Sequence, residues 1–439
     1  MAEDKAAALV DVVYGPDDSP RSSWDGFIYS LQWLLIMFYP VVWGYSIVGL
    51  GVGLEGSEMA QYMGRVVLVI GISTLVQALA GHRFSMVSGP NIIPSLAIVA
   101  AFAIGGREYA LLSFNAYIIA GVVVALLGAL GLISQIGRVW TPLVLGSMVM
   151  MVGLATSSVG MSLIAVHGAA WPFYAGVIIA LLCGWLSIRG NRFLATIPVL
   201  IAIVIGYVVF MAMGEFDWDL VRDMPRFVTP RLFPFGTGMP PLDLVMTMIV
   251  VNIFSAINLY GNVQGYANVI GAEVPTIREK RYFTIFGLVE GSLAGILGVP
   301  SHVSYGENLG LVMLTRVAAR IFIVIASIAF IVLSFFGQIG GLMAAMPQPV
   351  AGAVLLGVAS TLIGLGANIW HENQFGSREI FIVGFSVFFS LGVSFLPDSF
   401  FDQLPRLVGT LLNNPVIMVI ILVIVLEQLL FPERGEAAD

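Results

Sequence analysis

A polar segment, residues 298–310, separates two long apolar runs and constrains the fold more than any other part of the chain. Its sequence GVPSHVSYGENLG brings serine, histidine, tyrosine, glutamate and asparagine together between apolar residues 283–297 and 317–335. An irregular segment exposed to lipid is not viable, because each unpaired backbone group in hydrocarbon costs several kcal/mol. The segment must therefore lie at the membrane surface or be buried in protein, where it would line a site.

The glycines and the proline of this segment predict its local conformation. Gly298, Gly306 and Gly310 interrupt helical continuity and allow close backbone approach. Pro300 favours an extended residue before it. We expect a short extended piece and then a half-helix that opens near Gly306, with its first N–H groups and dipole facing a polar cavity. An ordinary surface loop is the alternative.

The composition indicates an integral membrane protein. Hydrophobic residues make up 59% of the 439 residues and charged residues only 10%, and the mean hydropathy is +0.97. A soluble domain carries about a quarter charged residues. The single cysteine excludes a disulfide framework. No Walker loop occurs, so ATP-driven pumping by this chain alone is not expected, and four scattered histidines do not predict a metal site.

A helical span needs about 20 largely apolar residues, and fourteen stretches qualify or nearly qualify. They are 27–52, 64–80, 84–104, 110–136, 143–165, 173–188, 194–213, 242–270, 283–299, 301–315, 317–337, 349–365, 380–396 and 415–430. The third and the tenth are the least lipid-like, and each belongs to a different set of seven. Interrupted helices at corresponding places in inverted halves are the best sequence indicator of a transport site at mid-membrane.

The domain organisation follows from this count. Because seven is odd, a second seven-span unit must be inserted upside down. We expect a cytoplasmic tail, a first repeat, an external linker, a second repeat and a second cytoplasmic tail. Their bounds are 1–23, 24–214, 215–241, 242–431 and 432–439. With both termini cytoplasmic, thirteen of the 19 Lys and Arg residues fall on the inside, as the positive-inside rule requires.

Few polar groups fall inside the expected spans, and these are functional candidates because they are costly there. Glu307 is the strongest, since it lies in the broken tenth span. Asn258 and Asn262 lie at i, i+4 on one face of the eighth span, which should meet protein, water or substrate. Gln32 lies in the first span. Glu290 lies in the ninth span, where a structural role on a helix-packing face is favoured two to one.

The segment 305–316, YGENLGLVMLTR, resembles the defining pattern of the nucleobase–ascorbate transporters, also called nucleobase:cation symporter family two. That pattern is an acidic or amide residue, Asn-x-Gly, four variable residues, Thr and a basic residue. Segments VSGPNI at 87–92, MPQPVAG at 346–352 and REIFIVGFS at 378–386 resemble the third, twelfth and thirteenth spans of the family. The resemblance covers essentially the whole membrane region.

The resemblance implies an all-α polytopic membrane protein with fourteen spans in two inverted seven-span repeats and short strands in spans three and ten. Spans one to four and eight to eleven would form a core domain, and the others a gate domain. Members are commonly homodimers in the plasma or inner membrane, and they work by an elevator-like motion of core against gate. The resemblance implies no enzyme activity, no cofactor and no nucleic-acid partner.

Substrate would bind between spans three and ten, facing span eight. The expected substrate-binding residues are Glu307, Asn258, Gly306, Tyr305, Asn308, Gln32, Trp33, Gly89, Asn91, Ile92 and Asn262. Asn258 stands where members commonly have a carboxylate, and Trp33 stands where they have a histidine. An amide cannot titrate, so Glu307 is the evident titratable group of the site.

The function expected is secondary transport of a small planar polar compound, most simply a nucleobase such as xanthine, urate or uracil. The coupling ion is a proton or sodium, or coupling is absent and the protein is a uniporter. A carrier of ascorbate-like compounds or of anions, as in the sulfate-permease family, is one alternative. A substrate-gated channel or membrane receptor is another.

Overall fold

The computed structural model describes residues 10–136, 140–166, 170–190, 194, 197–371, 375–401 and 403–432, and it is almost entirely helical. The elements of the first half are α1 (Ser23–Ile36), α2 (Tyr39–Trp43), π-helix η1 (Gly44–Gly49), α3 (Gly56–Ala80), β1 (Ser88–Pro90), α4 (Ile92–Leu130), α5 (Leu132–Ile136), α6 (Pro142–Ala165), α7 (Ala170–Arg189), α8 (Pro198–Ala212) and α9 (Asp219–Arg222). The outer parts of the two expected tails lie outside the described residues.

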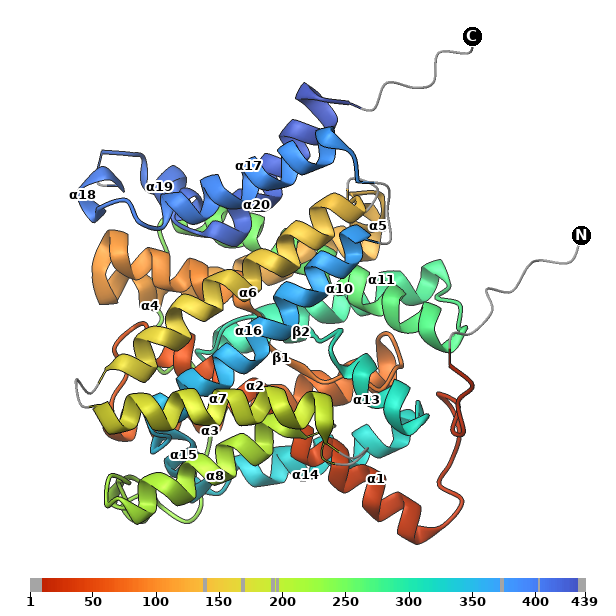
Figure 1. Cartoon of the computed structure of the whole chain (residues 1–439), viewed down its shortest axis with the longest axis vertical. Helices are drawn as coiled ribbons and strands as arrows, with labels where there is room; N and C mark the ends of the chain where they lie inside the picture. Colours follow the sequence, from red (N-terminus) through yellow and green to blue (C-terminus); the bar gives the residue numbers. More distant parts are fainter. Residues whose placement is uncertain are drawn as a thin grey trace, which may run out of the picture.

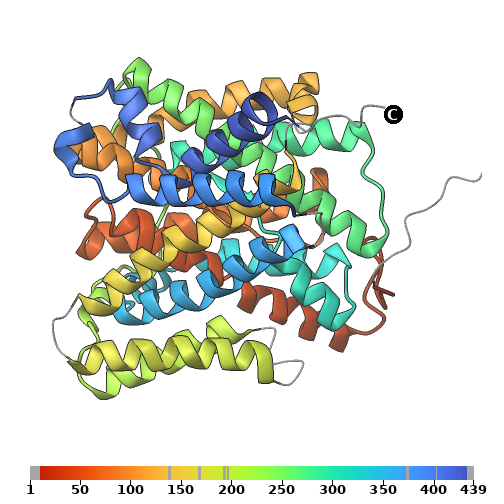
Figure 2. The same cartoon turned by 45° about the horizontal axis from the view of Figure 1, so that its top comes forward.

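The second half begins after the linker, at residue 242. Its elements are α10 (Leu242–Ile270), α11 (Thr276–Ile285), π-helix η4 (Phe286–Leu293), α12 (Ala294–Ile296), β2 (His302–Ser304), α13 (Asn308–Thr315), α14 (Arg320–Ser334), α15 (Gly337–Ala344), α16 (Gln348–His371), α17 (Ser377–Val393), α18 (Asp398–Phe401), α19 (Arg406–Leu412), α20 (Pro415–Ile424) and π-helix η5 (Val425–Leu430). The long helices lie roughly along one direction, and the two strands lie near the centre of the molecule (Figures 1 and 2).

The fold is a mostly helical, multi-span membrane fold. Seven helices in the described part of the chain are long and apolar enough to cross a bilayer, or nine if each of two sharply bent pairs is one span. The number is below fourteen because several expected spans are broken or short. The expected spans 84–104 and 110–136 join in α4, which is kinked at Gly106 with φ 73°, and α13 has only eight residues. Fourteen spans therefore stay a prediction.

Two groups of helices can be distinguished by their packing. In the first group, α4 packs against α10, α11 and η4, and α3 packs against α14. In the second group, α6 packs against α16, α7 packs against α8 and α16, and α17 packs against α20. The first group carries both strands, and its members are those expected for a core domain. The second group consists of the helices expected for a gate domain.

Helices α6 and α16 approach closely through small residues. A Cβ atom added to Gly160 would lie 2.9 Å from the Gly352 carbonyl oxygen, and one added to Gly352 would lie 2.4 Å from the Gly160 oxygen. Gly146 and Gly366 face each other in the same reciprocal way further along the pair. Small residues let helix backbones pack tightly where no hydrophobic driving force acts between helices. The order of these contacts shows that α6 and α16 run antiparallel.

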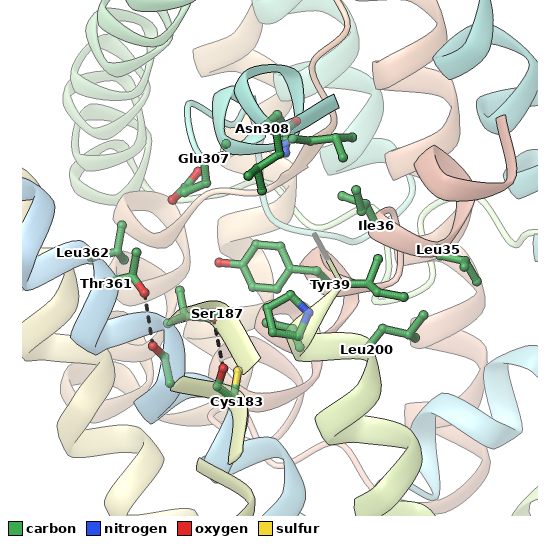
Figure 3. A pocket seen from close by; sticks show the side chains of 18 residues that line it. Leu35, Ile36, Tyr39, Cys183, Ser187, Leu200, Glu307, Asn308, Thr361 and Leu362 are labelled. Atoms are coloured by element: carbon green, nitrogen blue, oxygen red, sulfur yellow. Dashed lines mark hydrogen bonds between the residues drawn. The ribbon is translucent and has the colours of Figure 1, made fainter. Parts of the chain in front are cut away.

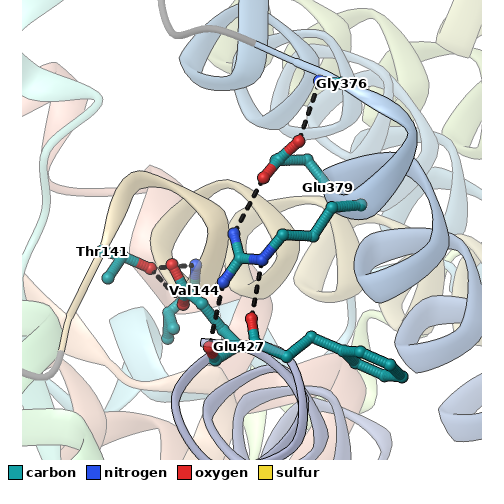
Figure 4. Close-up of polar contacts among 7 residues, drawn as sticks. Thr141, Val144, Gly376, Glu379 and Glu427 are labelled. Carbon is teal, nitrogen blue, oxygen red and sulfur yellow. Dashed lines mark hydrogen bonds and ion pairs between the residues drawn. The ribbon is translucent and has the colours of Figure 1, made fainter. Parts of the chain in front are cut away.

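An arginine ties the end of the last helix to the start of α17 (Figure 4). Arg378 Nε donates a hydrogen bond to the Phe431 carbonyl oxygen at 2.6 Å, and Nη2 donates to the Glu427 carbonyl oxygen at 3.0 Å. Nη1 forms an ion pair with Glu379 at 2.8 Å. The Glu427 carboxylate accepts a hydrogen bond from Thr141 Oγ1 at 2.6 Å. A cation here satisfies carbonyl groups that the helix end leaves unpaired.

Candidate functional site

Two short strands cross at the breaks in the expected third and tenth spans. They pair antiparallel, with Ser88 opposite Ser304, Gly89 opposite Val303 and Pro90 opposite His302. Two backbone hydrogen bonds extend the ladder at its ends, from the Asn91 N–H to the Ser301 oxygen and from the Tyr305 N–H to the Val87 oxygen, each at 2.9 Å. The strands therefore satisfy each other's backbone groups. The polar segment 298–310 is buried in protein over most of its length and is no surface loop.

Side chains add two hydrogen bonds across the strand pair and a third from a neighbouring helix. The Tyr305 hydroxyl donates to the Pro90 carbonyl oxygen at 2.6 Å, and the Asn308 side-chain oxygen accepts a hydrogen bond from the Val87 N–H. From the neighbouring helix α10, Asn262 donates to the Ser304 carbonyl oxygen at 2.9 Å. Pro90 has no N–H to donate to the ladder, and its carbonyl oxygen accepts the hydrogen bond from Tyr305.

A buried chain of polar side chains supports the strands from behind. The hydroxyl groups of Ser88 and Ser304 are 2.7 Å apart. His82 Nε2 lies 3.0 Å from the Ser304 hydroxyl, and Thr74 Oγ1 accepts from the Ser88 N–H at 2.9 Å. All four side chains are fully buried. A buried network whose polar groups are all hydrogen-bonded makes its surroundings more rigid. We therefore expect the strand pair to be a rigid part of the site.

A helix starts just after each strand. Helix α4 begins at Ile92, and Asn91 caps it by accepting a hydrogen bond from the Ile93 N–H at 3.1 Å. Helix α13 begins at Asn308, with Glu307 at its N-cap position. The prediction of a half-helix that opens near Gly306 is confirmed. The positive ends of both helix dipoles therefore lie beside the strand pair.

A narrow cavity of about 90 Å³ lies between these helix starts and the second group of helices. Its polar lining comes from Asn91, Asn258, Asn262, Tyr305 and Glu307. The other lining residues are Tyr39, Trp43, Pro90, Ile92, Val303 and Gly306 together with Met148, Val149, Val152, Leu362 and Leu365. The last five belong to α6 and α16. The cavity is thus closed on one side by the strands and α10 and on the other by α6 and α16.

The wall of the narrow cavity is rich in aromatic rings. The ring centroids of Tyr39 and Trp43 are 6.2 Å apart, and those of Tyr39 and Tyr305 are 6.0 Å apart. Aromatic faces at these separations bind flat, apolar or heteroaromatic surfaces well. Asn258 and Glu307 supply an amide and a carboxylate to the same space. Together they can hold a small planar molecule that has hydrogen-bonding groups at its edge.

A larger cavity of about 280 Å³ adjoins the narrow one, and Tyr39, Glu307 and Leu362 line both. Its remaining walls come from α1, α7, α8, α13 and α16. Glu307 and the ring of Tyr39 face the same space (Figure 3). Glu307 is therefore the carboxylate at the junction of two cavities, both of which lie between the two helix groups.

Eight of the eleven predicted site residues line these cavities. They are Glu307, Asn258, Gly306, Tyr305, Asn308, Asn91, Ile92 and Asn262. Gln32, Trp33 and Gly89 are absent from both linings. Trp33 is buried within α1, and Gly89 is covered by Pro40, on the face of the strand pair that it shares with Val303. Among the described residues, no group of three or more His, Cys, Asp or Glu side chains could hold a metal ion.

Sequence reasoning missed the aromatic residues Tyr39 and Trp43, which follow the break in the first span. Helix α1 ends at Ile36, and α2 starts at Tyr39 with Pro40 in its first turn. That proline, in a span otherwise apolar, is the signal that could have marked the break. The lining residues of α6 and α16 were missed as well. Nothing in the sequence distinguishes Met148 or Leu362 from any other apolar residue in a span.

Glu290 is fully buried in the π-helix η4, away from both cavities. Its Oε2 atom accepts a hydrogen bond from Gln77 Nε2 at 2.7 Å, while Oε1 has no hydrogen-bond partner among the described residues. Neighbouring Gly287 and Gly291 contact the backbone of α4. The ninth span therefore has the expected helix-packing face against α4. The Glu290 carboxylate pairs with Gln77 of α3.

The comparisons with known proteins identify the class of protein. A model of the permease family matches residues 25–399. The chain is 28% identical to the uric acid transporter UacT of Escherichia coli over 418 residues, which are 91% of this chain and 84% of that protein. It is 27% identical over 430 residues to the uracil permease of Bacillus caldolyticus, with 93% of each chain covered. It is 25% identical over 398 residues to the xanthine permease of Bacillus subtilis, covering 88% and 89%.

Solved structures share the fold at low sequence identity. The transmembrane domain of the cyanobacterial bicarbonate transporter BicA matches with a TM-score of 0.61 and 15% identity, covering 84% of this chain and 94% of that one. The murine anion transporter Slc26a9 matches with a TM-score of 0.60 and 12% identity, covering 91% and 68%. These likenesses show that the helix arrangement of this chain is shared with both structures. The chain belongs to the permease family, the nucleobase–ascorbate transporters, whose members are permeases and not enzymes.

Proposed function

We propose that the protein is a secondary active transporter of a purine or pyrimidine nucleobase, such as xanthine, urate or uracil. One observation carries this proposal. A narrow cavity between the two helix groups combines aromatic rings, three amides and one carboxylate beside the breaks of two spans. A nucleobase is flat, apolar on its faces and lined with N–H and carbonyl groups at its edge. The names of the relatives, uracil, xanthine and uric acid permeases, support the same substrate class.

In this proposal the base lies in the narrow cavity with its face against Tyr39, Trp43 and Tyr305. The Glu307 carboxylate accepts hydrogen bonds from ring N–H groups. Asn258 pairs with a carbonyl or amide edge, since its amide both donates and accepts. The backbone at Gly306 and the N-terminal ends of α4 and α13 favour negative charge on the bound base. Ionised urate or xanthine would benefit most from this last contribution.

The transport cycle that we propose moves the first helix group, with its strand pair and bound base, against α6 and α16. The cavity between the two groups supports such alternating access, because substrate contacts residues on both sides of the boundary. We further propose fourteen spans in two inverted repeats, cytoplasmic termini and a homodimer in the cell membrane. The coupling ion would be a proton or sodium, and Glu307 is the one carboxylate among the described residues that line the two cavities.

The test is substrate binding by purified protein and uptake into proteoliposomes. A ligand that binds only the folded state stabilises it by mass action, so the melting temperature is measured against nucleobases, ascorbate, bicarbonate and sulfate. Glu307→Gln keeps the size of the side chain but removes its charge, and it should abolish nucleobase binding and uptake while the protein stays folded. Glu273→Gln makes the same chemical change at an exposed position outside both cavities and should behave like the parent.

Three results would contradict the proposal. Binding within about threefold of the parent in Glu307→Gln, well under the 1.4 kcal/mol of a tenfold change, would remove Glu307 from the site. Stabilisation by bicarbonate or sulfate and not by any base would make the protein an anion carrier. Uptake that shows no saturable counterflow would indicate a channel.

A further inference from the structure

A buried arginine lies far from the proposed substrate cavity, in the part of α3 that the linker 215–241 covers. Arg65 is 4% exposed, although an arginine is almost never fully buried unless it is paired. Its guanidinium lies over the ring of Phe235 in the linker, with Cζ 5.6 Å from the ring centroid. A cation–π contact of this kind contributes attraction but supplies no negative charge.

No hydrogen bond or ion pair joins the Arg65 guanidinium to another residue in the part of the chain that the structure describes, and its Nε is buried without a partner. Glu58, a carboxylate that attracts Arg65 electrostatically, is already paired with Arg107. Arg231, in contrast, repels Arg65, because it carries a second positive charge. An unpaired buried charge costs far more than a paired one, so the site as built has a surplus of positive charge.

Arg65 and Arg231 line the same small pocket, of about 30 Å³. The other walls come from the linker at residues 224 and 228–230, from α3 and from the corner between α14 and α15. Helix α15 begins at Gly337, which lines the pocket, so the positive end of its dipole also faces this space. None of the described residues that line the pocket is acidic.

The volume limits what the pocket can hold. A cavity needs about 10–15 Å³ to hold one water molecule. The 30 Å³ of this pocket therefore suffices for one small ion and not for a nucleobase or a lipid headgroup. Two guanidinium groups, the hydroxyl of Thr229 and the amide of Gln61 offer donors around this space. Donors on several sides and a helix N-terminus together form a site for an anion.

We propose that this pocket binds a single small inorganic anion, chloride or another halide, between the Arg65 guanidinium and the linker. The anion would neutralise the buried charge of Arg65 and hold linker residues 224–235 against α3 and the α14–α15 corner. The site is separate from the proposed substrate cavity, because the two share no lining residue. Nucleobase binding and halide binding can therefore be tested independently.

The experiment measures the melting temperature of the purified full-length protein in sodium gluconate as chloride or bromide replaces gluconate at constant ionic strength. The melting temperature should rise saturably with halide in the parent. In Arg65→Gln the halide dependence should be lost, while nucleobase binding stays within about twofold of the parent. The control is Arg222→Gln, which removes an exposed arginine that lies over Trp218 in the same linker, and it should keep the halide response of the parent.

A second measurement on the parent protein alone covers the case in which Arg65→Gln does not fold. Crystals grown in bromide should show an anomalous peak within hydrogen-bonding distance of the Arg65 guanidinium. A melting temperature independent of halide, or a bromide map without a peak in this pocket, would overturn the proposal. Equal halide responses in the parent and in a folded Arg65→Gln would place the ion elsewhere and overturn it as well.

Discussion

Gly89→Ala tests whether the strand pair and the break in the first span are packed as the structure has them. A Cβ atom at residue 89 would lie 2.4 Å from Pro40 Cβ and 3.0 Å from both Pro40 Cγ and the Tyr305 hydroxyl. Ordinary contact begins near 3.4 Å, so Pro40 must retreat by about 1 Å. Overpacking of this kind typically costs about 1–3 kcal/mol.

The cost should appear in substrate binding as well as in stability. Pro40 lies in α2, which carries Tyr39 and Trp43 into the narrow cavity. When the overpacking disfavours the arrangement of Tyr39 and Trp43 that binds substrate, the same 1–3 kcal/mol is lost from the binding free energy. Kd then rises by about 5- to 150-fold, since 1.4 kcal/mol is a factor of ten. The assay is equilibrium binding of the nucleobase that the ligand screen selects, together with the melting temperature of the same preparation.

Gly184→Ala is the matched control for this prediction. Gly184 lies within α7, and an added Cβ atom meets nothing within 4 Å. Alanine is favoured over glycine in a helix interior by about 1 kcal/mol, so this variant should be as stable as the parent or slightly more stable. If Gly89→Ala binds and melts like Gly184→Ala, the strand pair does not press against Pro40 and the description of the site is wrong.

Two further predictions concern coupling and the helix ends. Asn258→Glu adds a second carboxylate to the cavity that Glu307 lines, so uptake should depend more steeply on pH than in the parent. Uptake is measured across external pH with sodium varied independently. Identical pH profiles for parent and variant would place residue 258 outside the coupling site. Arg378→Met removes charged hydrogen bonds to two carbonyl groups of the last helix and its ion pair with Glu379. The variant should lose about 1.5–3 kcal/mol of stability, seen as a lower melting temperature, with Kd unchanged; an unchanged melting temperature would show that this contact contributes nothing.

Several features of the site followed from the sequence because they depend on local chemistry. The polar residues and glycines of segment 298–310 cannot lie in lipid, so a break and a half-helix were predictable there. The i, i+4 spacing of Asn258 and Asn262 put both amides on one face of α10, and both line the narrow cavity. Glu307 was identifiable because a carboxylate in an apolar span is costly unless it has a function.

Other features could not be predicted from single residues. Gln32, Trp33 and Gly89 were expected at the site, but none of them lines a cavity. The rotation of α1 decides which of its sides faces inward, and Pro40 from α2 covers Gly89. The sequence did not single out Arg65. Arg65 is buried because the linker, more than 150 positions further along the chain, folds back over α3.

The sequence by itself determined that the chain is a membrane protein and that two spans are interrupted. Both conclusions rest on the cost of polar groups in hydrocarbon, which each segment incurs independently of its neighbours. Only the tertiary structure decided that the two breaks pair as antiparallel strands and that Tyr39, Met148 and Leu362 complete a cavity with them. These contacts join segments from distant parts of the chain, and apolar spans of similar composition carry no local signal of which neighbour they will face.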